Sequence, residues 1–407
     1  MGPSVTATAE LQGAAPYLRP GRIAGLVLRN RLVRASTSET MATEDGAVTE
    51  DLVRFYGALA DGGAGLLLTG HIHVRADGQC TPRQIGLHAD RFVPGLRRLT
   101  ARVHAGGARI FAELSHAGSQ TMMPGLTPPA PSGISSAIYP GVPRELPAAE
   151  IEDIVGDFGA AARRAAEAGF DGIHLHGGNG YLISQFGSPL TNRRDDAWGG
   201  DAERRGRFFM AVLDAVRGAV GPDLPVTARF GISDSIPGGM REEEGLARAA
   251  ALAARGLDGF EPSLNLMASY RDNIQPYVGL GMARALADWV APRLWSGAAP
   301  QGYYRPLARA LRRIAPDKAI ILVGGLRSTE AMAEVLDAGE ADFLSFARPF
   351  VREPDFPNQL AAGRRGMLDC VSCNICLQHD GYDALRCWRR DKRDLMRHAL
   401  WRLRRAP

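Results

Sequence analysis

The residues most suggestive of chemistry lie in GFDGIHLHGGNGYLISQF, which runs from Gly169 to Phe186. Within six residues this stretch places an imidazole (His176), a carboxamide (Asn179) and a phenol (Tyr181). Two neutral donors across a turn can converge on one carbonyl oxygen, and their hydrogen bonds strengthen as that oxygen gains negative charge. A tyrosine keeps its proton at neutral pH and can supply it as a general acid. Together the three side chains could polarise a carbonyl group and supply a proton.

Each of these residues also has a purely structural interpretation. Asn179 precedes a helical pattern, where it could cap the free backbone amides of that helix. His176 could be a hydrogen-bonded histidine inside a barrel, and Tyr181 could pack in the first helical turn.

The cysteines form a second group with chemical potential. Four of the five stand in CVSCNICLQHDGYDALRC, as Cys370, Cys373, Cys376 and Cys387. This spacing favours a metal site over disulfides in a chain expected to be cytoplasmic. Three close thiols and a distant fourth suit a [4Fe–4S] cluster, whereas zinc more often takes two C-x₂-C pairs. Four unmetallated thiols are the alternative.

Eight short β-rich segments, each followed by a helical pattern, would position these groups. Apolar segments such as AGLLLT and AIILVG are typical of strands buried on both faces of a parallel sheet. The stretches between them carry apolar residues at helical spacing and often end in glycine. The predicted strands span 31–35, 65–70, 109–114, 172–176, 224–230, 257–262, 319–324 and 341–346.

Eight β-then-α units predict an α/β fold, a (β/α)₈ TIM barrel. A doubly wound sheet is the competitor, but no G-x-G-x-x-G opens a helix after the first strand. The barrel is assigned to residues 15–365, and a cysteine-rich extension with a basic tail to 366–407. The long segment from Ser263 to Pro300 is expected to cover the mouth of the barrel.

Chemistry in such a barrel lies at the C-terminal ends of the strands. Residues from distant parts of the sequence should therefore gather there. They are Ser38, Gly70, Glu113, His176, Arg229 and Gly324.

The composition is that of an ordinary globular protein, with 45% hydrophobic and 23% charged residues in a chain of 407. No apolar run approaches the roughly 18 residues of a membrane span, and the N-terminus lacks a secretory signal. We therefore expect a cytoplasmic protein. From Arg386 to Pro407 there are nine Lys/Arg and two Asp, while the whole chain carries only +4. The body of the protein is thus not basic, which argues against nucleic-acid binding.

The basic tail is expected to form a solvated helix. Alternatively, the tail could dock on an acidic partner or on a neighbouring subunit.

The segment AGFDGIHLHGGNGYLISQFGSPLTNRRDDAWGGDAERRGRFF resembles the signature of the old yellow enzyme family of FMN-dependent oxidoreductases. RNRLVRAS, YGALADGGAGLLLTG, FAELSHAGSQ and LVGGLRSTEAMAEVLDAGEADFLSFARPFVREPDFP resemble further segments of that family, in the expected order. The resemblance covers about residues 17–360. It implies a (β/α)₈ barrel, in agreement with the strand count.

The resemblance implies catalytic roles by position. His176 and Asn179 would bind the activating oxygen of an α,β-unsaturated substrate, and Tyr181 would protonate its α-carbon. NAD(P)H would reduce FMN, and flavin N5 would then give a hydride to the β-carbon. We therefore expect FMN, NAD(P)H, a small enone, enal or enoyl thioester as substrate, and a homo-oligomer.

The resemblance also implies a flavin site. Arg229 would lie near flavin N1 and O2, where its fixed charge would stabilise the reduced anion. Gly324 and Gly325, with Ala347 and Arg348, would hold the phosphate. The other implied flavin-binding residues are Ser36, Thr37, Ser38, Gly70 and Glu113.

Two of these positions depart from the family pattern. Glu113 stands where the family usually has glutamine, so its carboxylate should disfavour the reduced flavin anion. Ser38 stands where threonine or cysteine is common. His71 and His73, in TGHIHV, are further candidates for the site.

The cysteine segment is similar to the iron–sulfur region of the longer branch of the family, which includes 2,4-dienoyl-CoA reductase and trimethylamine dehydrogenase. Those enzymes continue into dinucleotide-binding domains, for which this sequence shows no pattern. A cluster here would then pass electrons to another protein, such as an acidic ferredoxin or flavoprotein, or would be structural or vestigial. The competing functions are an amine dehydrogenase or N-demethylase, and a flavin- or phosphate-binding barrel without turnover.

Overall fold

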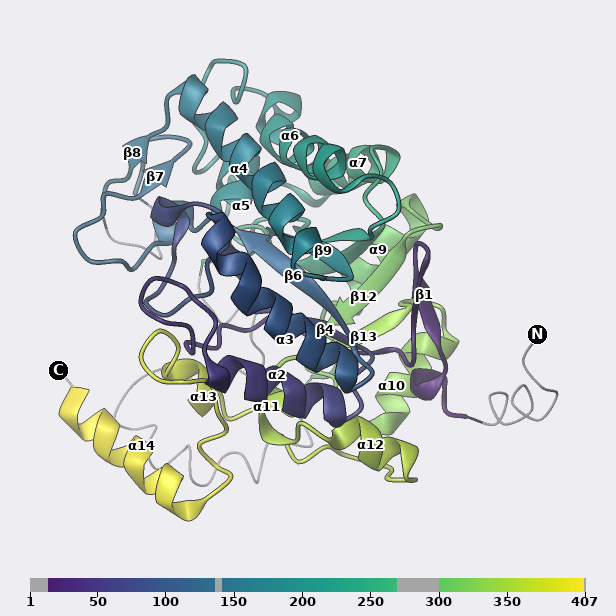
Figure 1. Cartoon of the computed structure of the whole chain (residues 1–407). Coiled ribbons are helices and arrows are strands. Elements are labelled where there is room, and N and C mark those ends of the chain that lie inside the picture. The colour runs from purple at the N-terminus through teal and green to yellow at the C-terminus, as the bar shows by residue number, and fades with distance from the viewer. Residues whose placement is uncertain (1–13, 136–140, 269–299, 406–407) are drawn as a thin grey trace.

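The computed structural model describes residues 14–135, 141–268 and 300–405 (Figure 1). The predicted cover of the barrel mouth falls mainly on residues 269–299, which lie outside the described residues.

Eight parallel strands close into a barrel. They pair in the order β4-β3-β13-β12-β11-β10-β9-β6, and β4 pairs with β6 to complete the ring. The strands are β3 (Leu32–Arg34), β4 (Leu66–Leu68), β6 (Arg109–Ser115), β9 (Gly172–Gly177), β10 (Val226–Gly231), β11 (Gly259–Ser263), β12 (Ala319–Val323) and β13 (Phe343–Phe346). Each lies within or beside a predicted strand, and the (β/α)₈ prediction is confirmed. A short strand, β5 (Ile72–His73), adds to β6 outside the ring.

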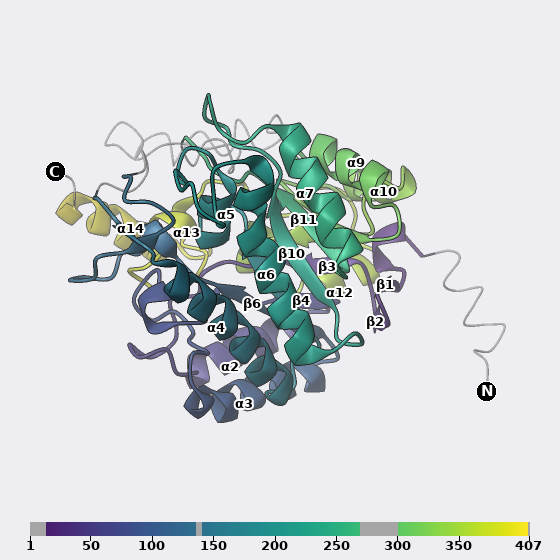
Figure 2. The same ribbon diagram turned by 90° about the horizontal axis from the view of Figure 1, so that it is seen from above.

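Helices surround the barrel (Figures 1 and 2). They are α2 (Glu50–Asp61), α3 (Val93–Ala105), α4 (Ala148–Glu167), α5 (Leu182–Gly187), α6 (Ala202–Val220), α7 (Glu242–Ala254), α9 (Arg305–Ile314), α10 (Thr329–Asp337), α11 (Arg348–Arg352) and α12 (Phe356–Ala361). Helix α2 shows why these segments are helical. The hydroxyl of Thr49 accepts a hydrogen bond from the Leu52 amide at its start. Leu52, Tyr56 and Leu59, at i, i+4 and i+7, are buried on one face.

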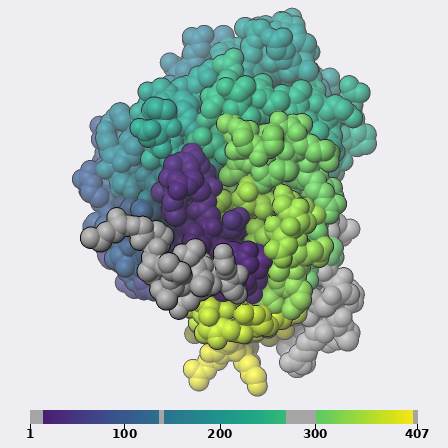
Figure 3. All heavy atoms as spheres, turned by 90° about the vertical axis from the view of Figure 1, so that its right-hand side faces the viewer, coloured from purple at the N-terminus to yellow at the C-terminus, as the bar shows by residue number. Residues whose placement is uncertain are grey.

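The interior of the barrel is apolar where its strands begin. Side chains from five strands form a separate buried cluster there: Val33, Leu66, Leu68, Phe111, Ile321 and Phe343. Ile23 and Leu28 join this cluster from the hairpin of β1 (Gly21–Ile23) and β2 (Leu26–Leu28), which closes this end. Figure 3 shows the N-terminal segment (purple) at the surface between the teal and green parts of the chain. Because alternate strand residues face inward, the same strands can present other side chains at their far ends.

The C-terminal extension packs on the loops that follow β3 and β5. The Leu385 amide donates to the Glu39 carbonyl over 2.9 Å, and Arg83 donates to the Tyr382 carbonyl over 2.8 Å. The extension contains α13 (Ile375–Gln378) and α14 (Lys392–Arg405), so the helix predicted for the basic tail is confirmed. The division at residue 365 stays a prediction. Within the described ranges, no helix combines the length and apolar character needed to cross a membrane.

One glycine tests how tightly a helix packs on the barrel. A Cβ built on Gly245 in α7 would overlap the carbonyl oxygen of Ile232, which follows β10, so backbone must move to admit it. We expect Gly245→Ala to lower the free energy of unfolding by about 1–3 kcal/mol. Gly156→Ala in α4 is the matched control, because nothing lies within 4 Å of its Cβ position. It should raise that free energy by about 0.5–1 kcal/mol. Urea unfolding of both variants checks this, and equal effects would contradict it.

Candidate active site

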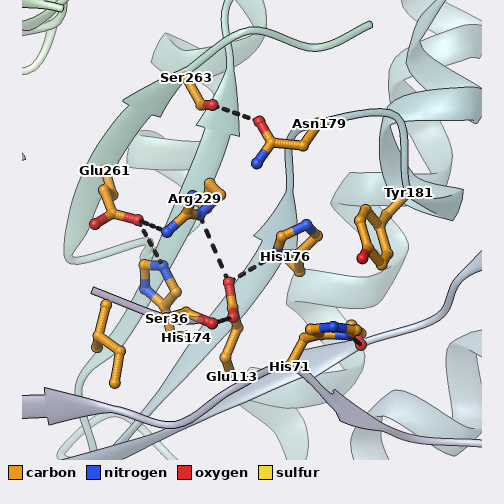
Figure 4. Close-up of polar contacts among 12 residues, drawn as sticks. Ser36, His71, Glu113, His174, His176, Asn179, Tyr181, Arg229, Glu261 and Ser263 are labelled. Carbon is orange, nitrogen blue, oxygen red and sulfur yellow. Dashed lines mark hydrogen bonds and ion pairs between the residues drawn. The ribbon is translucent and has the colours of Figure 1, made fainter. Parts of the chain in front are cut away.

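Charged and polar side chains fill the barrel where β6, β9, β10 and β11 end (Figure 4). These four strands are neighbours in the ring, so their carboxyl ends meet at one side of the mouth. The inward-facing residues there are Glu113, His174, His176, Arg229 and Glu261. All five are buried, and they contact one another as a single network.

Glu113 is the central acceptor of this network. Its Oε1 lies 2.6 Å from Nδ1 of His176 and 3.7 Å from Nε of Arg229. Its other oxygen accepts a hydrogen bond from the hydroxyl of Ser36. Burial by itself would raise the pKa of Glu113, but the charge and hydrogen bond of His176 and the charge of Arg229 outweigh it and hold that pKa well below its ordinary value. Glu113 is therefore a carboxylate at neutral pH.

This carboxylate decides how His176 can act. An ionised carboxylate only accepts hydrogen bonds, so Nδ1 of His176 must carry a proton. The opposite nitrogen, Nε2, then donates only when the ring is an imidazolium. Nε2 is fully buried and has no hydrogen-bond partner among the residues that the structure describes. The sequence suggested a neutral donor; in this site the donating form of His176 is a cation.

Arg229 is held by two carboxylates. Its Nη2 lies 2.6 Å from Oε2 of Glu261, and its Nε faces Glu113. Burial lowers the pKa of Arg229, but the charges of Glu261 and Glu113 more than offset this and raise it. Oε1 of Glu261 accepts from Ser345 over 2.7 Å, and His174 lies on its other side. The guanidinium is therefore a fixed positive charge inside the barrel.

His174 and Glu261 were not among the residues expected at the site, although the sequence carries a signal for both. His174 stands two residues before His176, on the same face of β9, and Glu261 is a charged residue within a predicted strand. A charge inside such a strand must find a partner at the same depth of the barrel.

Asn179 is not a helix cap, because α5 starts at Leu182 and its N-cap position is Tyr181. Asn179 has a left-handed backbone, with φ of 59°. Its Oδ1 accepts from the Ser263 hydroxyl over 2.6 Å, which turns its NH₂ group toward the side where His176 lies (Figure 4). The capping interpretation is thus wrong, and the carboxamide faces the site.

Tyr181 completes the group. Its ring stands edge-on to that of His176, with centroids 4.2 Å apart and an interplanar angle of 73°. Its hydroxyl lies 3.6 Å from the sulfur of Cys80. The structure thus brings the three side chains of the opening motif together, while their catalytic roles remain predictions.

Of the two further histidines, only His71 lies at the site. Its ring centroid is 5.3 Å from that of Tyr181 and 6.1 Å from that of His176. His73 turns away: its Nδ1 lies 3.0 Å from the Arg75 carbonyl and its ring stacks on His88.

Most of the residues predicted to bind the flavin share a cavity next to this network. Its walls include Ser36, Thr37, Arg229, Gly324, Gly325, Ala347 and Arg348. Gly324 and Gly325 have φ of 130° and 77°, and a Cβ on Gly325 would come within 3.0 Å of the Pro300 carbonyl. Backbone without side chains beside Arg348 suits a phosphate, and Arg229 suits the electron-rich edge of a flavin. The residues present therefore fit FMN.

Three predicted flavin residues do not line this cavity. Glu113 reaches it only through Ser36 and Arg229. Ser38 lies 3.5 Å from the Thr40 hydroxyl. The Gly70 amide already donates to Oε1 of Glu39 and to the Tyr56 hydroxyl, over 2.6 and 2.9 Å. A role for these three in flavin binding stays a prediction.

All four C-terminal cysteines line a second cavity, with Arg348, Asn374 and Trp388 among its other walls. Burial raises the pKa of the Cys373 thiol to about 11 and also raises those of Cys370 and Cys376. No three His, Cys, Asp or Glu side chains in the described part of the chain are arranged to hold a metal ion. The four thiols share one cavity but are not arranged as metal ligands, so a metal centre at these cysteines stays a prediction.

The barrel, the phosphate-type cradle and the buried arginine are the arrangement of a flavin-dependent oxidoreductase. Residues 18–366 match the NADH:flavin oxidoreductase / NADH oxidase family, and the chain belongs to this family, which includes the old yellow enzymes. FMN and NAD(P)H are the cofactors of the family. The family predicted from the sequence is thereby confirmed.

Three known proteins show the extent of the similarity. An NADH oxidase from Thermoanaerobacter brockii is 36% identical over 87% of this chain and 52% of its own length. A 4,4'-dithiodibutanoate disulfide reductase from Rhodococcus erythropolis is 34% identical, over 91% of this chain and 94% of its own. The solved structure of morphinone reductase aligns with a TM-score of 0.70 and 25% identity, over 89% of this chain and 93% of its own. This chain thus spans about half of the first protein and nearly all of the other two.

Replacing Glu113 by glutamine tests its influence on the flavin. The change removes a buried negative charge beside Arg229, which should make the reduced flavin anion easier to form. We expect Glu113→Gln to raise the reduction potential of the bound flavin, measured by anaerobic dye titration. Glu203→Gln, at an exposed position in α6, is the control and should leave the potential unchanged. An unchanged or lower potential for Glu113→Gln would remove Glu113 from the surroundings of the flavin.

Proposed function

We propose that this protein is an ene-reductase that uses NAD(P)H to reduce the activated C=C bond of an α,β-unsaturated carbonyl compound or enoyl thioester. The observation that carries the proposal is the convergence of His176, Asn179 and Tyr181 beside the cavity that fits FMN. FMN bound there would accept a hydride from NAD(P)H and deliver it to the β-carbon of the substrate. The protein supplies the two other requirements, polarisation of the carbonyl and a proton.

His176 and Asn179 polarise the carbonyl. The NH₂ group of Asn179 donates to the substrate oxygen, and Nε2 of His176 does so when its ring carries both protons, while Glu113 fixes the ring through Nδ1 over 2.6 Å. As hydride arrives at the β-carbon, negative charge develops on that oxygen and strengthens these hydrogen bonds. Loss of one such donor typically slows a reaction by roughly 10²–10³.

Tyr181 supplies the proton to the α-carbon. Its ring centroid lies 4.2 Å from that of His176, so the proton donor stands beside the group that binds the carbonyl. The proton and the hydride together saturate the double bond, and solvent returns the proton to Tyr181 afterwards.

The same trio argues against the amine dehydrogenase alternative. Its hydrogen-bond donors and its phenol suit a carbonyl oxygen, which accepts hydrogen bonds, better than a tertiary amine.

Disulfide reduction is a second candidate, because the matched-length Rhodococcus relative is named for it. Hydride transfer to one sulfur would break the S–S bond and release a thiol and a thiolate. The thiolate would form beside His176 and take its proton from Tyr181. The same three side chains would therefore serve this reaction.

Anaerobic stopped-flow kinetics tests the proposal. NADPH should bleach the bound flavin, and 2-cyclohexenone should restore its colour in the wild-type protein. Tyr181→Phe should slow the second step by about 10²–10⁴, the usual contribution of a general acid, and flavin bleaching by NADPH serves as the internal reference. A variant that reoxidises at the wild-type rate would exclude Tyr181 as the acid.

Parallel assays separate the functions. Turnover of 4,4'-dithiodibutanoate without enone reduction would favour the disulfide candidate. Oxidation of an N-methylated amine with a dye acceptor would favour the dehydrogenase. Failure of NADH and NADPH to bleach the flavin would support a barrel without turnover.

We further propose that the four cysteines bind a metal centre, for which their spacing favours [4Fe–4S]. The shared cavity supports this, but the thiols must turn inward to ligate, and no step of the reaction depends on the centre. The basic helix α14 would suit an acidic electron carrier, because its Lys and Arg residues would attract negative charge. Met396 and Leu400 lie exposed among them and would add apolar contacts to such an interface.

Metal analysis tests this second proposal. Protein purified without oxygen should contain about four iron and four sulfide per chain. Cys376→Ser should lower both contents, whereas Cys80→Ser, outside the cavity, should not. Zinc in place of iron would identify a zinc site, and absence of both metals would refute the proposal.

A further inference from the structure

His71 is a buried side chain at the site to which the proposed reaction gives no task. It follows β4 and faces the rings of Tyr181 and His176 (Figure 4). The side chains packed around it are Gln84, Ser115, Tyr181 and His176. Its position beside the proton donor and the carbonyl clamp makes it part of the wall around the substrate.

The protein selects one tautomer of His71. The Cys80 amide donates to Oε1 of Gln84 over 2.7 Å, which identifies that atom as the acceptor end of the carboxamide. The NH₂ group of Gln84 therefore faces His71, and lies 2.8 Å from its carbonyl oxygen and 2.9 Å from its Nδ1. Because Gln84 donates to Nδ1, this nitrogen accepts and the ring proton stays on Nε2.

The ring of His71 is also neutral. Burial, followed by the positive charge of His176, lowers the pKa of His71 to about 3, and Glu113 opposes this only in part. Nε2 therefore carries a single proton and can donate one hydrogen bond. Among the described residues no side chain or carbonyl accepts from it, and it is not one of the fully enclosed polar atoms.

We propose that His71 Nε2 binds a second acceptor oxygen of the substrate, so that the site selects double bonds flanked by two carbonyl groups, such as enediones, maleimides and diesters of unsaturated diacids. This inference rests on the proposed ene-reduction and names its substrate class. His176 and Asn179 take the activating carbonyl, and His71 takes the other. Because the ring centroids of the two histidines are 6.1 Å apart, both rings can contact one small substrate that lies against them.

Turnover of a matched substrate pair tests the inference. 4-Cyclopentene-1,3-dione and 2-cyclopentenone differ only in the second carbonyl group. We expect His71→Phe to lower the ratio of their kcat/KM values by about tenfold, the effect of one lost hydrogen bond. His71→Gln keeps an N–H donor near the position of Nε2 and should restore most of the ratio. His73→Phe is the control, because His73 is also buried but faces away, and it should leave the ratio unchanged.

A binding measurement separates this inference from the proposed function. Succinimide and 2-pyrrolidinone are not reduced and differ by one carbonyl group, and each can be titrated against the absorbance of the oxidised flavin. The wild type should prefer succinimide, and His71→Phe should lose about tenfold of that preference. If this shift occurs while neither enone is turned over, the proposed function fails and the role of His71 stands.

An unchanged binding ratio in flavin-loaded His71→Phe protein overturns the inference. So does an equal loss of affinity for both ligands, because that would indicate a merely structural role. If His71→Phe does not load flavin, His71→Leu replaces it in the same titrations, with His71→Gln as its rescue.

Discussion

The buried carboxylate of Glu113 controls the charge of the whole site. It lies 2.6 Å from one nitrogen of His176 and faces the guanidinium of Arg229, at a depth where the protein excludes water. An unpaired charge at this depth would be strongly destabilising, so each member of the network depends on the others. Because Glu113 can only accept, it decides which nitrogen of His176 holds a proton. A glutamine at this position would not impose this, since its carboxamide can also donate.

The barrel can contain such a network because its interior has two parts. Where the strands begin, inward residues such as Phe111 and Ile321 form an apolar cluster that the β1–β2 hairpin closes. Two residues further along β6, the same face presents Glu113. The apolar part supplies the hydrophobic stabilisation, and its packing holds the strand ends at fixed distances. Rigid strand ends place catalytic groups more accurately than loops do.

Two cavities meet at Arg348. This residue lines the cavity that fits FMN and also the cavity of the four cysteines, and its Nη1 lies 2.5 Å from Oδ1 of Asn374 within the cysteine segment. Ser372 and Leu377, from the same segment, line the first cavity as well. The C-terminal extension therefore forms part of the wall of the flavin site, and a change in the cysteine segment would reach the phosphate cradle through Arg348.

The sequence by itself determined the eight strands, the family and the cluster of His176, Asn179 and Tyr181. These are local properties: apolar runs, 3.6-residue periodicity and side chains a few positions apart, whose relative placement the backbone limits. Only the tertiary structure decided how these residues are paired. Glu113 and His176 are 63 residues apart, and Ser263 turns Asn179 from 84 residues away. Glu261 meets both His174 and Arg229 only inside the closed barrel. The protonation states of these buried side chains depend on such contacts, because burial and neighbouring charges shift a pKa. Neither the burial of a side chain nor its charged neighbours can be predicted from the sequence of one strand.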